Sequence, residues 1–220
     1  MRGLERALEH KVLDGFGFFV AASNTFCLKN VNRSQEDLLA ELEVLLEKSR
    51  KAKKKTRVYL STLVFCPYEG AMAPAKVLRL AKQVLKLRPN EIVLSDTTGD
   101  ANPLSLDRVL KPLLRIAPAS KFALHVHDTR GLALANSWHA YNLGIRRFDS
   151  SVGGSGGCPF APGATGNLAT EDLVNLFAGA ALLRGVDLGR LTLVSKQLEK
   201  DLKKKLPARM LSVLRGSSSS

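Results

Sequence analysis

The sequence predicts an α/β fold made of repeated parallel βα units. Short runs of apolar and β-branched residues alternate with longer segments whose apolar residues have helical spacing. The chain has 220 residues, 45% of them apolar, which is enough for one domain with a sizeable core. An open doubly wound sheet and a closed eight-stranded barrel both satisfy this pattern. In either fold the active site lies at the carboxyl ends of the strands.

Five apolar runs are predicted as strands because each is short and is followed by a helical segment. No dinucleotide-binding fingerprint of the Gly-x-Gly-x-x-Gly kind follows the first of them. The strands are expected at Phe16–Ala22, Arg57–Val64, Glu91–Asp96, Lys121–His127 and Arg147–Val152.

The predicted helices begin at recognisable signals. Ser34 and Asp37 have the spacing of an N-cap and its third helical residue, and Pro74 and Pro103 stand where helices tolerate proline. Gly3–Leu13 is a further helix with no strand before it, so the chain is expected to begin partway through the pattern. The other helices are expected at about Ser34–Lys54, Pro74–Leu87, Pro103–Ile116, Leu132–Leu143, Glu171–Leu183 and Leu191–Lys205.

The net charge of +13 is concentrated in two runs, Arg50–Arg57 and Lys196–Arg215. Neither run interleaves aromatic residues or carries a nucleic-acid motif, and cations in a helix's last turn complement its dipole. We therefore expect solvated helix ends and no nucleic-acid partner. The alternative is a site for a polyanion, which a nucleotide-bearing coenzyme satisfies as well as RNA does.

Several classes are excluded by composition. No run approaches 18 uninterrupted apolar residues, so no membrane span is expected. Three cysteines, Cys27, Cys66 and Cys158, cannot form a disulfide framework and predict an intracellular chain. The first ten residues contain Glu5 and Glu9 and read as neither a signal peptide nor a transit peptide.

A histidine pair at a strand end is the strongest local signal of chemistry. His125 and His127 precede Asp128, and alternation along a strand turns both imidazoles to one face, roughly 7 Å apart. This spacing favours a shared cation over the alternative, a hydrogen-bonded pair that closes the strand.

Residues 153–167 contain six glycines and lead into the helix predicted at Glu171. Such a backbone reaches left-handed conformations and lets a ligand approach, so a mobile lid carrying Cys158 is favoured over a plain linker. Near its end, Asn167 is either a turn residue or an oxygen ligand for a hard cation. At another strand end, Asp96 is either functional or a turn cap. Cys66 is expected to be a buried apolar residue.

Longer stretches resemble the 3-hydroxy-3-methylglutaryl-CoA lyase family. The similarity runs in consistent order to about Leu191, with departures at lining positions such as Val126, Arg130, Gly153 and Ser155. The matching stretches are Ala21–Asn30, Phe65–Gly70, Ala73–Val77, Leu94–Thr97, His125–Thr129 and Asp149–Asp172, the last with Gly-Gly-Cys-Pro-Phe and Gly-Asn-Leu-Ala-Thr-Glu-Asp.

The resemblance implies a (β/α)8 TIM barrel, incomplete here, whose five strands correspond to the fourth to eighth. Residues 1–190 are then a partial barrel domain, and residues 191–220 a basic helix with a flexible Ser-rich tail. The implied activity is metal-dependent cleavage of 3-hydroxy-3-methylglutaryl-CoA to acetyl-CoA and acetoacetate, a step of leucine catabolism and ketone-body formation. The implied compartment is the mitochondrial matrix, with the cytoplasm as the alternative, and a homo-oligomer is compatible with the family.

The same resemblance assigns roles to residues. It makes His125, His127 and Asn167 ligands of a divalent cation, Mg²⁺ or Mn²⁺, with His125 also handling the substrate's hydroxyl proton. Cys158 becomes the loop thiol that donates or relays a proton. In addition, Asp96 matches an active-site carboxylate, and Glu171 and Asp172 are expected to support the loop and Asn167.

One family feature does not occur in the sequence. The family's first strand ends in Arg-Asp-Gly, which supplies a substrate-binding arginine and a further metal ligand, and no Arg-Asp-Gly is found among the 220 residues. The sequence therefore predicts a truncated product with negligible activity, or a binding or assembly subunit of the same family. A third alternative, a related carbon-ligase or aldolase barrel, is disfavoured by the loop that contains Gly-Gly-Cys-Pro-Phe.

Overall fold

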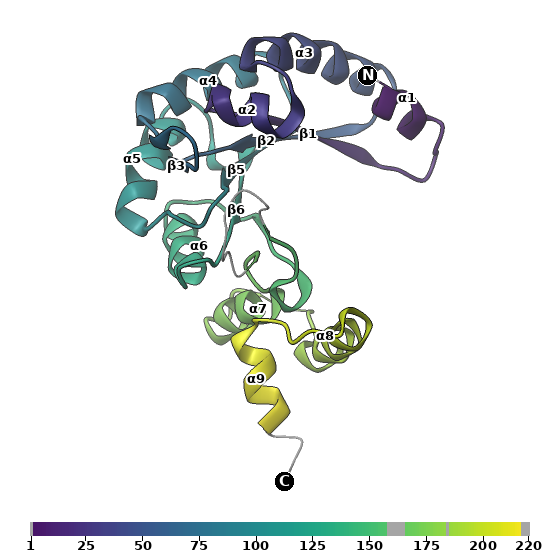
Figure 1. Ribbon diagram of the computed structural model, residues 1–220, viewed down its shortest axis with the longest axis vertical. Coiled ribbons are helices and arrows are strands. Elements are labelled where there is room, and N and C mark those ends of the chain that lie inside the picture. The colour runs from purple at the N-terminus through teal and green to yellow at the C-terminus, as the bar shows by residue number, and fades with distance from the viewer. Residues whose placement is uncertain (1, 158–165, 184, 217–220) are drawn as a thin grey trace.

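The computed structural model describes residues 2–157, 166–183 and 185–216. A curved parallel sheet forms its upper part, with helices packed along the convex side (Figure 1). The strands lie in chain order, β1 (Gly15–Ala21), β2 (Lys55–Ser61), β5 (Glu91–Asp96), β6 (Phe122–Val126) and β7 (Phe148–Asp149). A doubly wound sheet reverses its order at a switch point, whereas a barrel does not. The order therefore confirms part of a barrel.

All five predicted strands are present, and the main difference is at the last. β7 has two residues instead of the six predicted, because a turn of 3-10 helix at Val152–Gly154 follows it closely. Gly153 and Gly154 have φ of 63° and 74°, values that strands do not accommodate. Thr62, with φ of 56°, similarly ends β2 before the predicted boundary.

The predicted helices are confirmed with shifts of a few residues at their ends. Ser34 and Asp37 form the expected capping box at the start of α3, and prolines occupy the first positions of α4 and α5. The helices are α1 (Arg2–Leu8), α3 (Gln35–Lys51), α4 (Pro74–Lys86), α5 (Pro103–Leu114), α6 (Ala133–Asn142), α7 (Thr170–Gly179) and α8 (Leu188–Leu202).

Several short elements were not predicted. They are α2 (Asn24–Val31), the hairpin of β3 (Phe65–Cys66) and β4 (Gly70–Ala71), a 3-10 turn at Ala119–Lys121, and α9 (Arg209–Gly216). The last packs with α8 on α7, through a small apolar cluster of Ala169, Leu206, Ala208 and Leu211. Residues 191–216 thus fold against the rest of the chain, and the Ser-rich end predicted as flexible, residues 217–220, lies outside the described residues.

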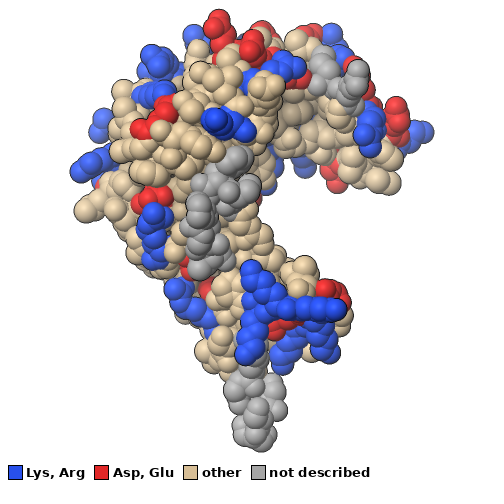
Figure 2. Space-filling model, viewed as in Figure 1, with Lys and Arg blue, Asp and Glu red and all other residues tan. Residues whose placement is uncertain are grey.

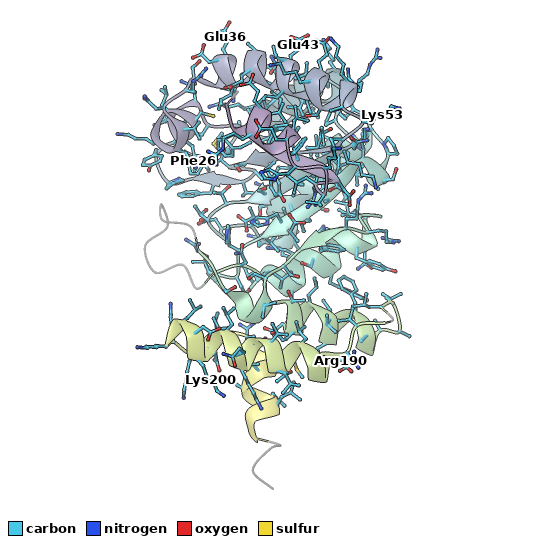
Figure 3. All side chains as sticks on the ribbon, turned by 90° about the vertical axis from the view of Figure 1, so that its right-hand side faces the viewer. Phe26, Glu36, Glu43, Lys53, Arg190 and Lys200 are labelled. Atoms are coloured by element: carbon cyan, nitrogen blue, oxygen red, sulfur yellow. The ribbon has the colours of Figure 1, made fainter. Side chains whose placement is uncertain are left out.

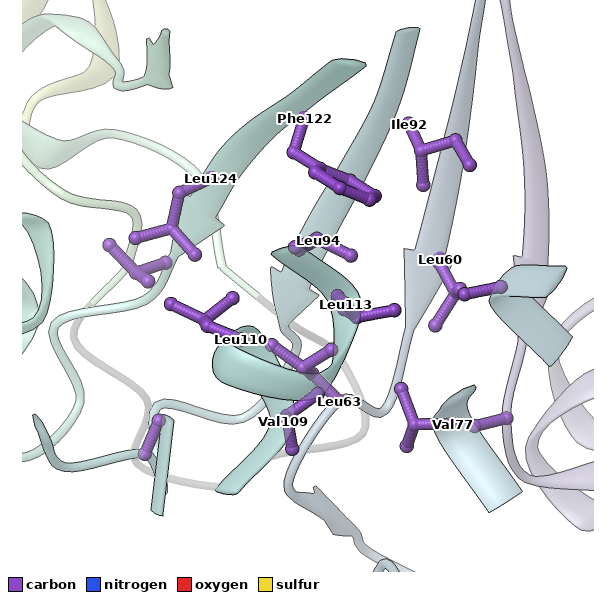
Figure 4. Close-up of a cluster of buried hydrophobic side chains, with 14 of the residues drawn as sticks. Leu60, Leu63, Val77, Ile92, Leu94, Val109, Leu110, Leu113, Phe122 and Leu124 are labelled. Carbon is purple, nitrogen blue, oxygen red and sulfur yellow. The ribbon is translucent and has the colours of Figure 1, made fainter. Parts of the chain in front are cut away.

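The main core lies between the convex face of the sheet and its helices. Alternate strand residues such as Leu60, Leu94 and Phe122 are fully buried in one cluster with Leu110 and Leu113 of α5 (Figure 4). On the outside of this layer, Glu36 and Glu43 of α3 point to solvent (Figure 3). The other strand residues are left to line the concave face. No helix in the described part of the chain is long and apolar enough to cross a membrane.

Candidate functional site

The two predicted histidines meet on the concave face. His125 lies on β6 and His127 directly follows it, with ring centroids 5.1 Å apart and ring planes at 86°. Nδ1 of His127 lies 3.0 Å from the backbone carbonyl oxygen of Asp96. A carbonyl oxygen only accepts, so the imidazole proton is on Nδ1 and the lone pair is on Nε2. Burial lowers the pKa of His127, which favours the neutral imidazole that binds metals.

Asn167 lies next to His127 through a backbone contact. Its backbone forms an antiparallel bridge with His127, and its side-chain Nδ2 donates to the Ser155 carbonyl at 2.9 Å. Its Oδ1 is buried and has no hydrogen-bond partner among the described residues. A buried, unpaired amide oxygen costs free energy unless something binds it.

These three residues fit a divalent cation. Two imidazole nitrogens and an amide oxygen are ligands that such cations accept, and an orphaned oxygen marks an open coordination position. In the described residues, no group of three or more His, Cys, Asp and Glu side chains could hold a metal. A site here therefore depends on the amide of Asn167.

A cavity of about 430 Å³ opens in front of the histidines. Phe19, Phe26 and Tyr59 form an aromatic wall, and Ser95 and Thr97 supply hydroxyl groups. The space-filling view shows the same side of the molecule as an open hollow between its upper and lower parts (Figure 2). An apolar wall facing a few convergent polar groups is typical of a ligand site.

The carboxylate of Asp96 turns away from this cavity. It stands between Ser95 and Thr97, which line the cavity, and its two oxygens accept the backbone N–H groups of Asp100 and Ala101, each at 3.1 Å. Burial raises its pKa to about 6. Its backbone carbonyl, not its carboxylate, contacts His127, so the geometry favours the turn-cap alternative.

The glycine-rich loop is held firmly at its base. A Cβ on Gly153 would lie 2.3 Å from a methyl carbon of Leu206, and one on Gly166 would lie 2.3 Å from the Gly154 carbonyl oxygen. Both residues also have positive φ, so the backbone conformation and the lack of space for a side chain each require glycine. Cys158 lies outside the described residues.

The two predicted supporting acids act at different places. Glu171 is fully buried, accepts the Gly153 N–H at 2.8 Å, and also accepts the hydroxyl of Ser195 from α8. Glu171 therefore contacts the first residue of the loop. Asp172 instead accepts the N–H groups of Arg209 and Met210, at 3.1 and 2.8 Å, and so caps α9. These contacts lie on α9, which the sequence did not predict, and the support of the loop and Asn167 by Asp172 stays a prediction.

Sequence reasoning missed an ionic cluster on the concave face. Asp149 of β7 lies opposite His125 in the sheet register and is bound by Arg57 of β2, with Tyr59 and Glu91 adjoining. All have odd numbers on neighbouring strands, as do the two histidines. Alternation within a strand would have placed Arg57 and Tyr59 on one face, but the contact of Arg57 with Asp149 depends on the curvature of the sheet.

The two basic runs have different surroundings. In the first, Arg50 and Lys54 bond backbone carbonyl oxygens, Lys51 pairs with Glu47, and Arg57 points into the concave face. The run is therefore divided between exposed residues such as Lys51 and Lys53 and a concave-face residue, Arg57. In the second, five lysines line a shallow surface pocket around the end of α8, where Lys and Arg also gather in Figure 2. They are Lys196, Lys200, Lys203, Lys204 and Lys205.

Comparisons with known proteins agree with the resemblance. The HMGL-like family model matches residues 1–198. Hydroxymethylglutaryl-CoA lyase YngG of Bacillus subtilis is 43% identical over 216 residues, covering 98% of this chain and 72% of that protein. The mitochondrial hydroxymethylglutaryl-CoA lyase of Bos taurus is 43% identical over 173 residues, 79% of this chain and 53% of its own length.

Solved structures show the same relationship. The Bacillus subtilis HMG-CoA lyase superposes with a TM-score of 0.94 at 42% identity, covering 98% of this chain and 72% of its own. An HMG-CoA lyase from Acinetobacter baumannii, solved with coenzyme A and 3-methylmalate, has a TM-score of 0.89 at 36% identity, covering 96% and 68%.

Proposed function

We propose that this chain, which belongs to the HMGL-like family, acts on 3-hydroxy-3-methylglutaryl-CoA. The relatives compared above are hydroxymethylglutaryl-CoA lyases. The products would be acetyl-CoA and acetoacetate. The observation that carries the proposal is that two imidazoles line a cavity on the barrel's inner face, and that Asn167, whose amide oxygen has no partner among the described residues, pairs through its backbone with one of them, His127. The relative solved with coenzyme A and 3-methylmalate supports a CoA ester as the substrate.

We infer that His125, His127 and Asn167 hold a divalent cation, Mg²⁺ or Mn²⁺. When bound there, the cation supplies positive charge to oxygens on which negative charge develops. The neutral state of His127 and the open Oδ1 of Asn167 support this assignment. Residues around them fix the ligands: the Asp96 carbonyl orients His127, and Ser155 orients Asn167.

The chain's own residues would handle two protons. His125 would act as the base through its Nε2 lone pair while that lone pair is not bound to the cation: it accepts the proton of the substrate's tertiary hydroxyl, the C–C bond breaks to give the ketone of acetoacetate, and the electron pair passes to the enolate of acetyl-CoA. That enolate takes a proton, which we assign to the thiol of Cys158. General acid–base groups commonly contribute about 10²–10⁴-fold to a rate. In this scheme Glu171 has an indirect role, because it holds the base of the loop that carries Cys158.

The proposal is tested by measuring acetoacetate formation by the purified chain with Mg²⁺, with Mn²⁺ and with EDTA. We expect His125→Gln, His127→Gln and Asn167→Ala to lose metal affinity and activity together. His139→Gln is the matched control, because His139 pairs with Asp107 on the outer helices. Activity that survives both EDTA and these site substitutions would refute the metal assignment.

The role of Cys158 has its own test. Cys158→Ala should reduce kcat much more than it weakens Mn²⁺ binding, since the thiol is assigned to proton transfer and loop closure. Rate measurements and metal titration on the same variant make the comparison. Equal losses in both would show that the cysteine is a ligand.

A second candidate function is binding without turnover. It is favoured by the absence of an Arg-Asp-Gly sequence among the 220 residues. Retained binding of Mn²⁺ or coenzyme A with no acetoacetate formed would support it. For the compartment, we propose the mitochondrial matrix, supported by the names of the mammalian mitochondrial relatives, with cytoplasmic and bacterial relatives supporting the alternative.

A further inference from the structure

The Nδ1 atom of His125 needs a partner that the proposed function does not provide. It is buried and has no hydrogen bond within ordinary distance among the described residues. The Oδ2 atom of Asp149 lies 3.6 Å from it, on the neighbouring strand and directly opposite in register. Hydrogen bonds in active sites are often long before a ligand binds, so this pair is poised to close.

Asp149 is itself held from across the sheet. Its Oδ1 pairs with Nη2 of Arg57 at 2.8 Å, although β5 and β6 lie between their strands. Only the curvature of the sheet lets the arginine reach that far. The guanidinium is fixed in turn, because its Nε pairs with Glu91 and its Nη1 donates to the Tyr59 hydroxyl at 3.3 Å. With Oδ1 engaged, Oδ2 is the oxygen left for His125.

The ring of His125 is also confined by its neighbours. Tyr59 meets it edge to face, with centroids 6.0 Å apart and planes at 84°. His127 meets it on another side at 5.1 Å. Because the ring has little room to rotate, a partner on Nδ1 decides which nitrogen faces the cavity with a lone pair.

We propose that Asp149, held by Arg57, is the positioning residue of His125: it accepts the Nδ1 proton and so presents the Nε2 lone pair to the cavity. The inference rests on the proposed function in one respect, the identity of the group that the Nε2 lone pair binds, which is the divalent cation. The same arrangement is found at His127, whose Nδ1–H donates to the Asp96 carbonyl oxygen. A ligand histidine commonly donates its second N–H to a carboxylate or carbonyl, and loss of that partner costs about 10–100-fold in metal affinity or activity.

The test is the tautomer of His125 in the full chain without metal or substrate. Long-range ¹H–¹⁵N NMR correlations separate Nδ1–H from Nε2–H imidazoles, and single His→Gln variants assign the four histidines. In the parent protein we expect the Nδ1–H form. In Asp149→Asn, which keeps the shape but removes the charge, we expect the proton to move largely to Nε2 and Mn²⁺ affinity to fall about 10–100-fold.

Asp107→Asn is the matched control, because it removes a carboxylate 2.6 Å from Nε2 of His139, far from the cavity on α5 and α6. It should leave the His125 signals unchanged. If Asp149→Asn does not fold, variants of Arg57 provide a second test. Arg57→Lys keeps the positive charge and should retain the Nδ1–H form of His125, whereas Arg57→Gln should lose part of it. An unchanged His125 tautomer in a folded Asp149→Asn or Arg57→Gln variant would overturn the proposal. Since no lyase assay enters, an inactive chain can still confirm or refute it.

Discussion

At the scale of single residues, Gly153 allows a tightly packed left-handed turn and also forms hydrogen bonds to two other segments. Its φ of 63° is disfavoured for other residues, and Leu206 occupies the space that a side chain would need. Its N–H donates to Glu171 and its carbonyl accepts from Ala208. Gly153 thus connects the base of the glycine-rich loop to α7 and to the segment leading into α9.

Gly153→Ala should therefore destabilise the protein by roughly 2–5 kcal/mol, combining about 1–2 for the left-handed backbone with about 1–3 for overpacking against Leu206. Gly70→Ala is the control, because Gly70 also has positive φ but no other atom lies within 4 Å of the point where its Cβ would stand. Urea unfolding measures both. Equal losses in the two variants would show that the contact with Leu206 is unimportant.

The buried carboxylate of Asp96 gives a pH signature. Burial raises its pKa to about 6 in the folded state, above the ordinary value of 3.8. Because the folded state holds this proton more tightly, the contribution is present below about pH 4 and is lost as pH rises through 6. Relative to Asp96→Asn, the parent should lose up to about 3 kcal/mol between pH 4 and 7. Unfolding free energies of both proteins across that range give the difference, and a flat difference would contradict the raised pKa.

At the scale of elements, the sequence predicted the strands and long helices well because their apolar periodicity is strong. The elements it missed are short, and two of them, α2 and α9, depend on contacts made elsewhere in the chain. Ser23, which caps α2, is bound by Glu69, and Asp172 caps α9 from α7. Of the candidate site, strand alternation predicted the shared face of the histidines. It did not predict Arg57, whose partner Asp149 becomes a neighbour only when the sheet curves.

The capping of α9 by Asp172 can be tested directly. Asp172→Ala should weaken the docking of α9 by roughly 0.5–2 kcal/mol, the usual cost of losing a cap. Hydrogen exchange should accelerate in α9. Asp187→Ala is the control, because Asp187 caps the exposed start of α8 through the Arg190 N–H. Unchanged protection of α9 in Asp172→Ala would mean that its apolar contacts alone hold it.

At the scale of the whole molecule, one curved sheet explains both the core and the site. Its convex face buries aliphatic side chains under helices, and its concave face gathers the histidines and the ionic cluster. With five strands in the described part of the chain, this curved sheet does not close on itself. Among the described residues, β1 and β7 each pair with one neighbour only.

Open edges of this kind favour pairing with other chains. A protein of these 220 residues alone should therefore associate as its concentration rises, which sedimentation velocity over a hundredfold dilution will measure. Gly17→Lys places a charge on the exposed edge strand β1 and should reduce association. Leu104→Lys is the control, since it replaces another exposed residue, 75% accessible, on α5 and away from both edges. If only Gly17→Lys lowers the sedimentation coefficient at high concentration, association runs through β1. If the parent stays monomeric throughout, the unpaired edges are protected in solution, and the open sheet does not drive assembly.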